Sequence, residues 1–139
     1  MQKIKPLKVI FKSIEDFSAQ SRLLLQEALR ERKSISKKDT LVWASVEAYQ
    51  QFMSDQKYAI LAAIYRYHPK SIYQLAKILG RAQQNVSRDC DLLEGHGFIR
   101  FEEVEEGRKI KTPRLVFDYN AILVRLPSVT YQVGFGNAA

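Results

Sequence analysis

The sequence contains a single cysteine, Cys90, and this scarcity excludes several classes of protein. One thiol cannot form an internal disulfide, so a disulfide-rich secreted scaffold is excluded and a reducing compartment is favoured. The two histidines, His68 and His96, do not stand at metal-ligand spacing from Cys90. We therefore expect no metal and no cofactor, and we expect Cys90 to pack as a small apolar residue rather than act as a redox sensor.

Long apolar runs and catalytic groupings are also missing. No stretch approaches the roughly 18 uninterrupted apolar residues of a membrane span. The first residues, MQKIKPLKVIFKS, are basic, but lysines interrupt their apolar part, unlike in a signal peptide. Asp89, Asp91 and Glu94 form a group of carboxylates, but no nucleophile or glycine-rich phosphate loop accompanies them. We therefore expect a cytoplasmic binding protein and not an enzyme.

The positive charge of the chain indicates the kind of partner. Its 139 residues fit one domain, and the net charge of +7 favours an anionic partner, nucleic acid first. The surplus is N-terminal, since residues 1–40 contain ten Lys/Arg against five Asp/Glu, whereas residues 80–98 contain two against three. The basic run RERKSISKK at 30–38 is equally well explained as part of a solvated polar connector.

The N-terminal third predicts strands followed by helices. Residues 7–12 are rich in β-branched and aromatic side chains and predict a strand, and a helix is expected over 13–32. VIFKSIEDF (9–17) and LVWASVEAY (41–49) share one order of aliphatic, aromatic, serine and glutamate residues. This similarity has two explanations: chance, or two strand–helix units that pair with each other or across a dimer.

The centre of the chain predicts three helices, expected over 54–68, 71–79 and 82–94. Pro69 stops the first helix and Gly80 ends the second. Val86, Cys90 and Leu93 recur at helical spacing and should point inward from the third. Three short helices with tight links are the helix-turn-helix arrangement.

The pattern alternates after Gly97. FIRFEEVEE and KIKTPRLVF predict a hairpin with its tip at Gly107-Arg108, and YNAILVRL predicts a further strand over 119–126. The tail SVTYQVGFGNAA has little pattern and is expected to be mobile, with Tyr131 and Phe135 available to dock on a partner.

The outer face of the third helix is polar and suited to DNA. On a helix, the residues left outside are Gln83, Gln84, Asn85, Ser87, Arg88 and Asp91. Arg fits guanine, Gln and Asn fit adenine, and a helix N-terminus offers free N–H groups to a phosphate. The alternative is an ordinary solvated helix face, because any exposed helix is polar outside.

The stretch SIYQLAKILGRAQQNVSRDCDLLEGHGFI followed by a hairpin resembles the winged helix-turn-helix of prokaryotic transcription regulators, the multiple-antibiotic-resistance regulator type especially. The matching features are Leu75-Ala76, Gly80, Val86-Ser87-Arg88, Leu93-Glu94, Gly97 and Ile99. The resemblance covers about residues 54–117. The following GRKIKTPRLVFDYNAILVRLP is more loosely similar to a small group of regulators, some linked to toxin–antitoxin loci.

The resemblance implies an α+β fold, a winged helix-turn-helix with an N-terminal strand–helix extension and a C-terminal strand. The expected divisions are an extension over 1–53 that serves dimerisation, a DNA-binding domain over 54–126 and a flexible tail over 127–139. The resemblance further implies a homodimeric, sequence-specific transcription regulator on double-stranded DNA. Its dimer contacts would come from the N-terminal strand–helix units or the C-terminal strand.

Carried over residue by residue, the resemblance implies a set of DNA-binding residues. The recognition helix would apply its outer residues to base edges, the turn before it would approach a phosphate, and the hairpin tip would act as the wing. The set comprises Arg81, Gln83, Gln84, Asn85, Ser87, Arg88, Arg108 and Lys109.

Two departures from the family pattern keep another function open. Ala82 stands where relatives have a capping Ser or Asp, and the hairpin contains Glu102, Glu103, Glu105 and Glu106, which repel phosphates. These glutamates should divide between two faces, with Lys111 and Arg114 pairing some of them. The alternative function is a protein-interaction module, or an antitoxin whose winged helix binds a protein such as a toxin. An RNA-binding winged helix is a third option.

Overall fold

A computed structural model describes residues 3–11, 23, 35–37, 39–105, 107–126 and 129–136. Its strands are β1 (Pro6–Phe11), β2 (Ile35–Lys37), β3 (Thr40–Trp43), β4 (Ile99–Glu105), β5 (Lys109–Leu115), β6 (Ala121–Arg125) and β7 (Thr130–Gly134). Its helices are α2 (Val46–Phe52), α3 (Asp55–Tyr67), α4 (Ile72–Leu79) and α5 (Gln83–Gly95). The fold is therefore α+β. The helix expected over 13–32 lies outside the described residues apart from Leu23.

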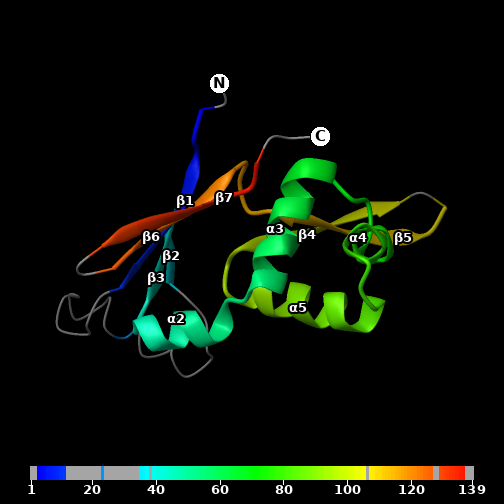
Figure 1. The fold of residues 1–139 in the computed structure, drawn as a ribbon. Helices are drawn as coiled ribbons and strands as arrows, with labels where there is room; N and C mark the ends of the chain where they lie inside the picture. The colour runs from blue at the N-terminus through cyan, green and yellow to red at the C-terminus, as the bar shows by residue number, and fades with distance from the viewer. Residues whose placement is uncertain are drawn as a thin grey trace.

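Helix α3 lies between two β structures (Figure 1). On one side is a five-stranded sheet in the order β2-β3-β1-β6-β7, and on the other are α4, α5 and the hairpin formed by β4 and β5. One hydrophobic core joins the two sides, with Leu7 and Val9 from β1 in the same buried cluster as Leu75 and Leu93. Among the described helices, none is both long and apolar enough to cross a membrane.

Strand β1 is the centre of the sheet, parallel to both β3 and β6. The two similar segments of the N-terminal third pair in register through their strands, with Val9, Ile10 and Phe11 opposite Leu41, Val42 and Trp43. The hypothesis that these segments pair with each other is thus confirmed for the strands. Asn120 closes the far end of the sheet, where its side chain accepts from Lys5 N and donates to Lys3 O, both at 2.8 Å.

The sheet differs from the expected layout in three places. The expected polar connector RKSISKKD, residues 32–39, contains β2, because three of its residues pair with β3. The expected tail contains β7, which pairs with β6, and Phe135 is buried against the rings of Tyr65 and Tyr119 rather than free for a partner. The expected domain boundary at residue 54 would divide the sheet, because β1 lies before this residue and pairs with β6, which lies after it.

The three central helices begin and end close to the expected residues. The side chains of Ser54 and Ser71 accept hydrogen bonds from Lys57 N and Gln74 N and so cap α3 and α4. Gly80 ends α4 with a φ of +66°, a left-handed conformation that favours glycine. The short turn that follows sets α5 against α4.

Candidate functional site

Helix α5 divides into the two expected faces. Val86, Cys90 and Leu93 are fully buried. The opposite face borders a shallow hollow lined by Gln83, Gln84, Ser87, Arg88 and Asp91. The structure therefore brings four of the predicted site residues together on one open surface.

A second hollow lies between the first turn of α4, the start of α5 and the hairpin. Its lining consists of Ser71, Ile72, Tyr73, Gln83, Arg108, Lys109, Ile110 and Lys111. Gln83 borders both hollows, so they adjoin. We call the residues lining the two hollows the α5–hairpin surface. It contains six of the eight predicted residues, and its members come from the consecutive helices α4 and α5 and from the hairpin.

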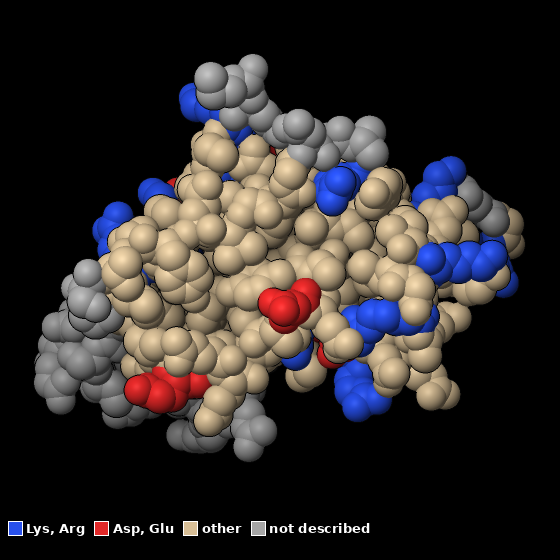
Figure 2. Space-filling model, in the orientation of Figure 1, with Lys and Arg blue, Asp and Glu red and all other residues tan. Residues whose placement is uncertain are grey.

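Basic side chains gather on this side of the molecule. Figure 2 shows Lys and Arg over the hairpin and over α4 and α5. Arg88, Arg108, Lys109 and Lys111 line the α5–hairpin surface, against one carboxylate, Asp91. The local charge balance is therefore positive, although the segment 80–98 taken alone is acidic.

Sequence reasoning missed residues that adjoin this surface from α4. Tyr73 is 54% exposed, and Lys77 Nζ lies 4.8 Å from the centre of its ring. The two residues stand at i and i+4 on the outer face of α4, and this spacing in the sequence could have predicted their contact. Lys111 was expected to pair with a hairpin glutamate, and its place in the hollow depends on how the hairpin sits against α4.

The side chain of Arg81 contacts Asp89, whereas the sequence predicted a contact with a DNA phosphate. Its Nη2 donates to Asp89 Oδ2 at 2.9 Å, and the two side chains are 18% and 16% exposed. This ion pair links the turn after α4 to the body of α5, at its second turn.

The exposed end of α5 has a preformed polar arrangement. Arg88 Nη2 donates to Asn85 Oδ1 at 3.0 Å, which orients the guanidinium along the helix. Ala82 makes no side-chain capping bond, as its residue type predicts. The first N–H groups of α5, at Gln83 and Gln84, therefore lack a side-chain cap at the positive end of the helix.

Glu102, Glu103 and Glu105 divide between the two faces of the hairpin, as the alternation predicts, while Glu106 lies outside the described residues. Glu103 and Glu105 stand directly opposite Lys111 and Lys109. On the other face, Glu102 accepts from Arg114 Nε at 3.1 Å. Each of these carboxylates has a basic neighbour across the strand, which reduces its repulsion of a phosphate.

Two titratable groups of the α5 region have shifted pKa values: Cys90 on its buried face and His96 at its C-terminal end. Burial raises the pKa of the Cys90 thiol to about 12, and the nearby carboxylates of Asp89 and Asp91 raise it further. The His96 ring stacks on Trp43 with centroids 4.8 Å apart, and Nδ1 is buried without a partner among the described residues. Burial first, and then the charge of Lys57, lower the pKa of His96. Both groups are thus held uncharged inside the fold.

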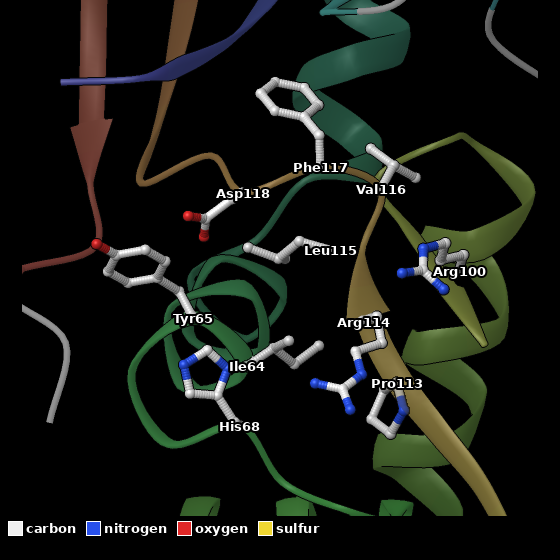
Figure 3. Close-up of a pocket in the computed structure, with 10 residues that line it drawn as sticks. All are labelled: Ile64, Tyr65, His68, Arg100, Pro113, Arg114, Leu115, Val116, Phe117 and Asp118. Carbon is white, nitrogen blue, oxygen red and sulfur yellow. The ribbon is translucent and has the colours of Figure 1, made fainter. Parts of the chain in front are cut away.

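A third hollow lies between α3 and the hairpin formed by β4 and β5 (Figure 3). Its lining consists of Ile64, Tyr65, His68, Arg100, Pro113, Arg114, Leu115, Val116, Phe117 and Asp118. Its volume of about 210 Å³ is below the usual range for ligand pockets. None of the predicted site residues borders it. Within the described part of the chain, no three His, Cys, Asp or Glu side chains are grouped as metal ligands.

Comparison with known proteins gave one match. The family model HVO_A0114 matches residues 52–124, just over half of the chain. Neither the curated proteins nor the solved structures gave a match. The matched range contains α3, α4, α5, the hairpin and nearly all of β6.

Proposed function

The chain belongs to the HVO_A0114 family, and from this premise we propose that it is a sequence-specific double-stranded DNA-binding transcription regulator. The family description names no activity, so the proposal depends on geometry. Three helices followed by an antiparallel hairpin match the order of a winged helix-turn-helix. In this proposal α5 is the recognition helix and the hairpin is the wing.

The observation that supports the proposal best is the continuity of the α5–hairpin surface. A helix in a major groove needs polar residues along one face and basic residues beside it for the neighbouring phosphates. Gln83 borders both the polar hollow of α5 and the basic hollow of the hairpin. An ordinary solvated helix face gives no reason for this junction.

Each residue has a proposed role. Gln83, Gln84 and Arg88 contact base edges, and Asn85 and Ser87 assist them. Arg108 and Lys109 contact the minor groove or its backbone, while Lys111 neutralises a phosphate. The uncapped N–H groups of α5 also face a phosphate. Arg81 holds α5 in place through Asp89.

The regulator is proposed to act in the cytoplasm as a homodimer. One short helix buries too little surface for strong specificity, and two helices about 34–36 Å apart contact successive major grooves. Bound at a promoter, such a dimer blocks or recruits the transcription machinery.

One observation favours the alternative, a protein-interaction module or antitoxin. Tyr73 and Ile78 of α4 and Leu92 of α5 are exposed at 54%, 42% and 42%. Large exposed apolar side chains are enriched where proteins bind one another. A protein partner on these helices would compete with DNA for the same side of the molecule.

Binding to DNA selected from a random pool tests the proposal. Arg88→Ala and Gln84→Ala each remove one proposed base contact, so we expect roughly 5- to 150-fold weaker specific binding. Because both side chains are exposed, thermal stability should stay nearly unchanged. Lys109→Ala should weaken binding to all sequences and flatten the dependence of log affinity on log salt by about 0.9.

Arg125→Ala is the matched control, since this arginine is exposed on β6, away from α5. It removes the same charge and should leave the salt dependence unchanged. Binding that is insensitive to salt, or equal losses for Arg125→Ala and Arg88→Ala, would contradict the proposal.

A further inference from the structure

Strand β7 ends the five-stranded sheet, so one of its edges is open within the described residues (Figure 1). Two backbone hydrogen bonds show which residues face β6. Leu126 N donates to Val129 O at 2.8 Å, and Phe135 N donates to Asn120 O at 3.0 Å. Hydrogen-bonded and non-hydrogen-bonded pairs alternate along two antiparallel strands. The two bonds lie at opposite ends of β7, and both agree with the same assignment of hydrogen-bonded pairs along the strand.

The alternation leaves Thr130, Gln132 and Gly134 in non-hydrogen-bonded pairs with β6. Their N–H and C=O groups therefore point away from β6, along the open edge. Proteins usually protect such an edge with a charged residue, a proline or a bulge. The residues Thr130–Gly134 contain neither charge nor proline, whereas β2, at the other end of the sheet, contains Lys37.

We propose that β7 pairs with β7 of a second copy of this chain, antiparallel, about a two-fold axis at Gln132. In this register Gln132 stands opposite Gln132 of the second copy, and Thr130 stands opposite Gly134. Each of the three pairs exchanges two hydrogen bonds, so the six outward groups of each strand are all satisfied. A register shifted by two residues leaves one of these pairs unmade, which favours the register centred on Gln132.

The side chains agree with this register. Tyr131 stands opposite Val133 of the second copy, an aromatic and β-branched pair of the kind that stabilises antiparallel sheets. Tyr131 is 37% exposed and Val133 is partly exposed, so both have surface left to bury. Two copies of a chain with a net charge of +7 repel one another. Because β7 contains no charged side chain, pairing through it brings no like charges of this strand together.

The inference deepens the homodimer of the proposed function by identifying its interface, and it depends on the sheet alone. The result is a continuous ten-stranded sheet across two copies, with one α5 on each. Self-association and DNA binding are separate measurements. A dimer that binds no DNA would contradict the proposed function, and a monomer that binds DNA would contradict the interface.

Disulfide trapping tests the register. Gln132→Cys places two thiols on residues whose Cα atoms are about 5.5 Å apart, within the range of disulfides, so mild oxidation should give a covalent dimer. Thr130→Cys is the matched control, because the two copies of residue 130 would be four residues apart, roughly 13 Å. The native Cys90 is fully buried and should not react. Equal cross-linking of the two variants would overturn the proposed register.

Charge exchange at the same residue tests the interface without oxidation. Gln132→Lys and Gln132→Glu each place like charges opposite one another, so sedimentation should show a roughly tenfold higher dimer dissociation constant for each. An equimolar mixture should regain dimer, since Lys then faces Glu. Thermal unfolding of dilute protein checks that both variants fold. A monomeric wild type, or a mixture that gains nothing, would refute the proposal.

Discussion

The Arg81–Asp89 pair offers a test of how α5 is held. The side chains are 18% and 16% exposed and 2.9 Å apart, so the pair lies between an exposed ion pair, worth about 0–1 kcal/mol, and a buried one. Removing either partner leaves the other charge mostly buried and unpaired. We expect Arg81→Ala and Asp89→Ala each to lower the free energy of unfolding by about 2 kcal/mol, or roughly 8 °C in Tm.

The double variant separates the interaction energy of the pair from the effect of losing each side chain by itself. Because the second substitution removes a charge that is already unpaired, Arg81→Ala with Asp89→Ala should cost about 1–2 kcal/mol less than the sum of the single variants. Urea unfolding followed by the fluorescence of Trp43, the one tryptophan in the chain, measures all four proteins. Additive losses would refute the stabilising role of the pair.

DNA binding provides the second part of this test. If Arg81 positions α5 through Asp89, Arg81→Ala weakens specific binding but leaves the slope of log affinity against log salt unchanged. If Arg81 instead contacts a phosphate, that slope falls by about 1, as expected for Lys109→Ala. A measurement well below the Tm of the variant keeps unfolding out of the comparison.

The buried thiol and the stacked imidazole give two further tests. With its pKa raised to about 12 by burial, Cys90 should react with a thiol reagent only through opening of the fold, so labelling should accelerate with urea; fast labelling of the native protein would contradict this. The pKa of His96 is lowered by burial, so the unfolded chain binds the proton more readily than the native one. Stability should be fully present above about pH 6.5 and decline as the pH falls below it, and His96→Phe should reduce this decline; an equal decline in both proteins would assign it to other groups.

The helical part of the fold was predictable because local signals mark its limits. Ser54 and Ser71 cap two helices, Gly80 ends one, and the spacing of Val86, Cys90 and Leu93 identifies the buried face of α5. These signals act within a few residues, so the sequence contains them directly. The outer residues of α5 follow from the same periodicity.

The remainder depends on contacts between residues far apart in the chain. Strand β7 has only weak alternation of its own, and its pairing with β6 makes it a strand. Arg81 and Asp89 meet across a turn, a spacing that no helical rule predicts. Lys111 was recognisable as basic, but its place beside Gln83 depends on how the hairpin packs on α4.

The central position of β1 affects the order in which the chain can fold during synthesis. Helices α3 to α5 and the hairpin are continuous in sequence, so they can assemble once residue 115 has left the ribosome. Strand β1 is made well before β6, which is one of its two neighbours, and Lys5 and Asn120, which bond at this end of the sheet, are 115 residues apart. Until then Leu7 and Val9, which become fully buried, lack their neighbours on β6. The nascent chain therefore presents an apolar strand until β6 is made, and exposed strands of this kind are prone to aggregate.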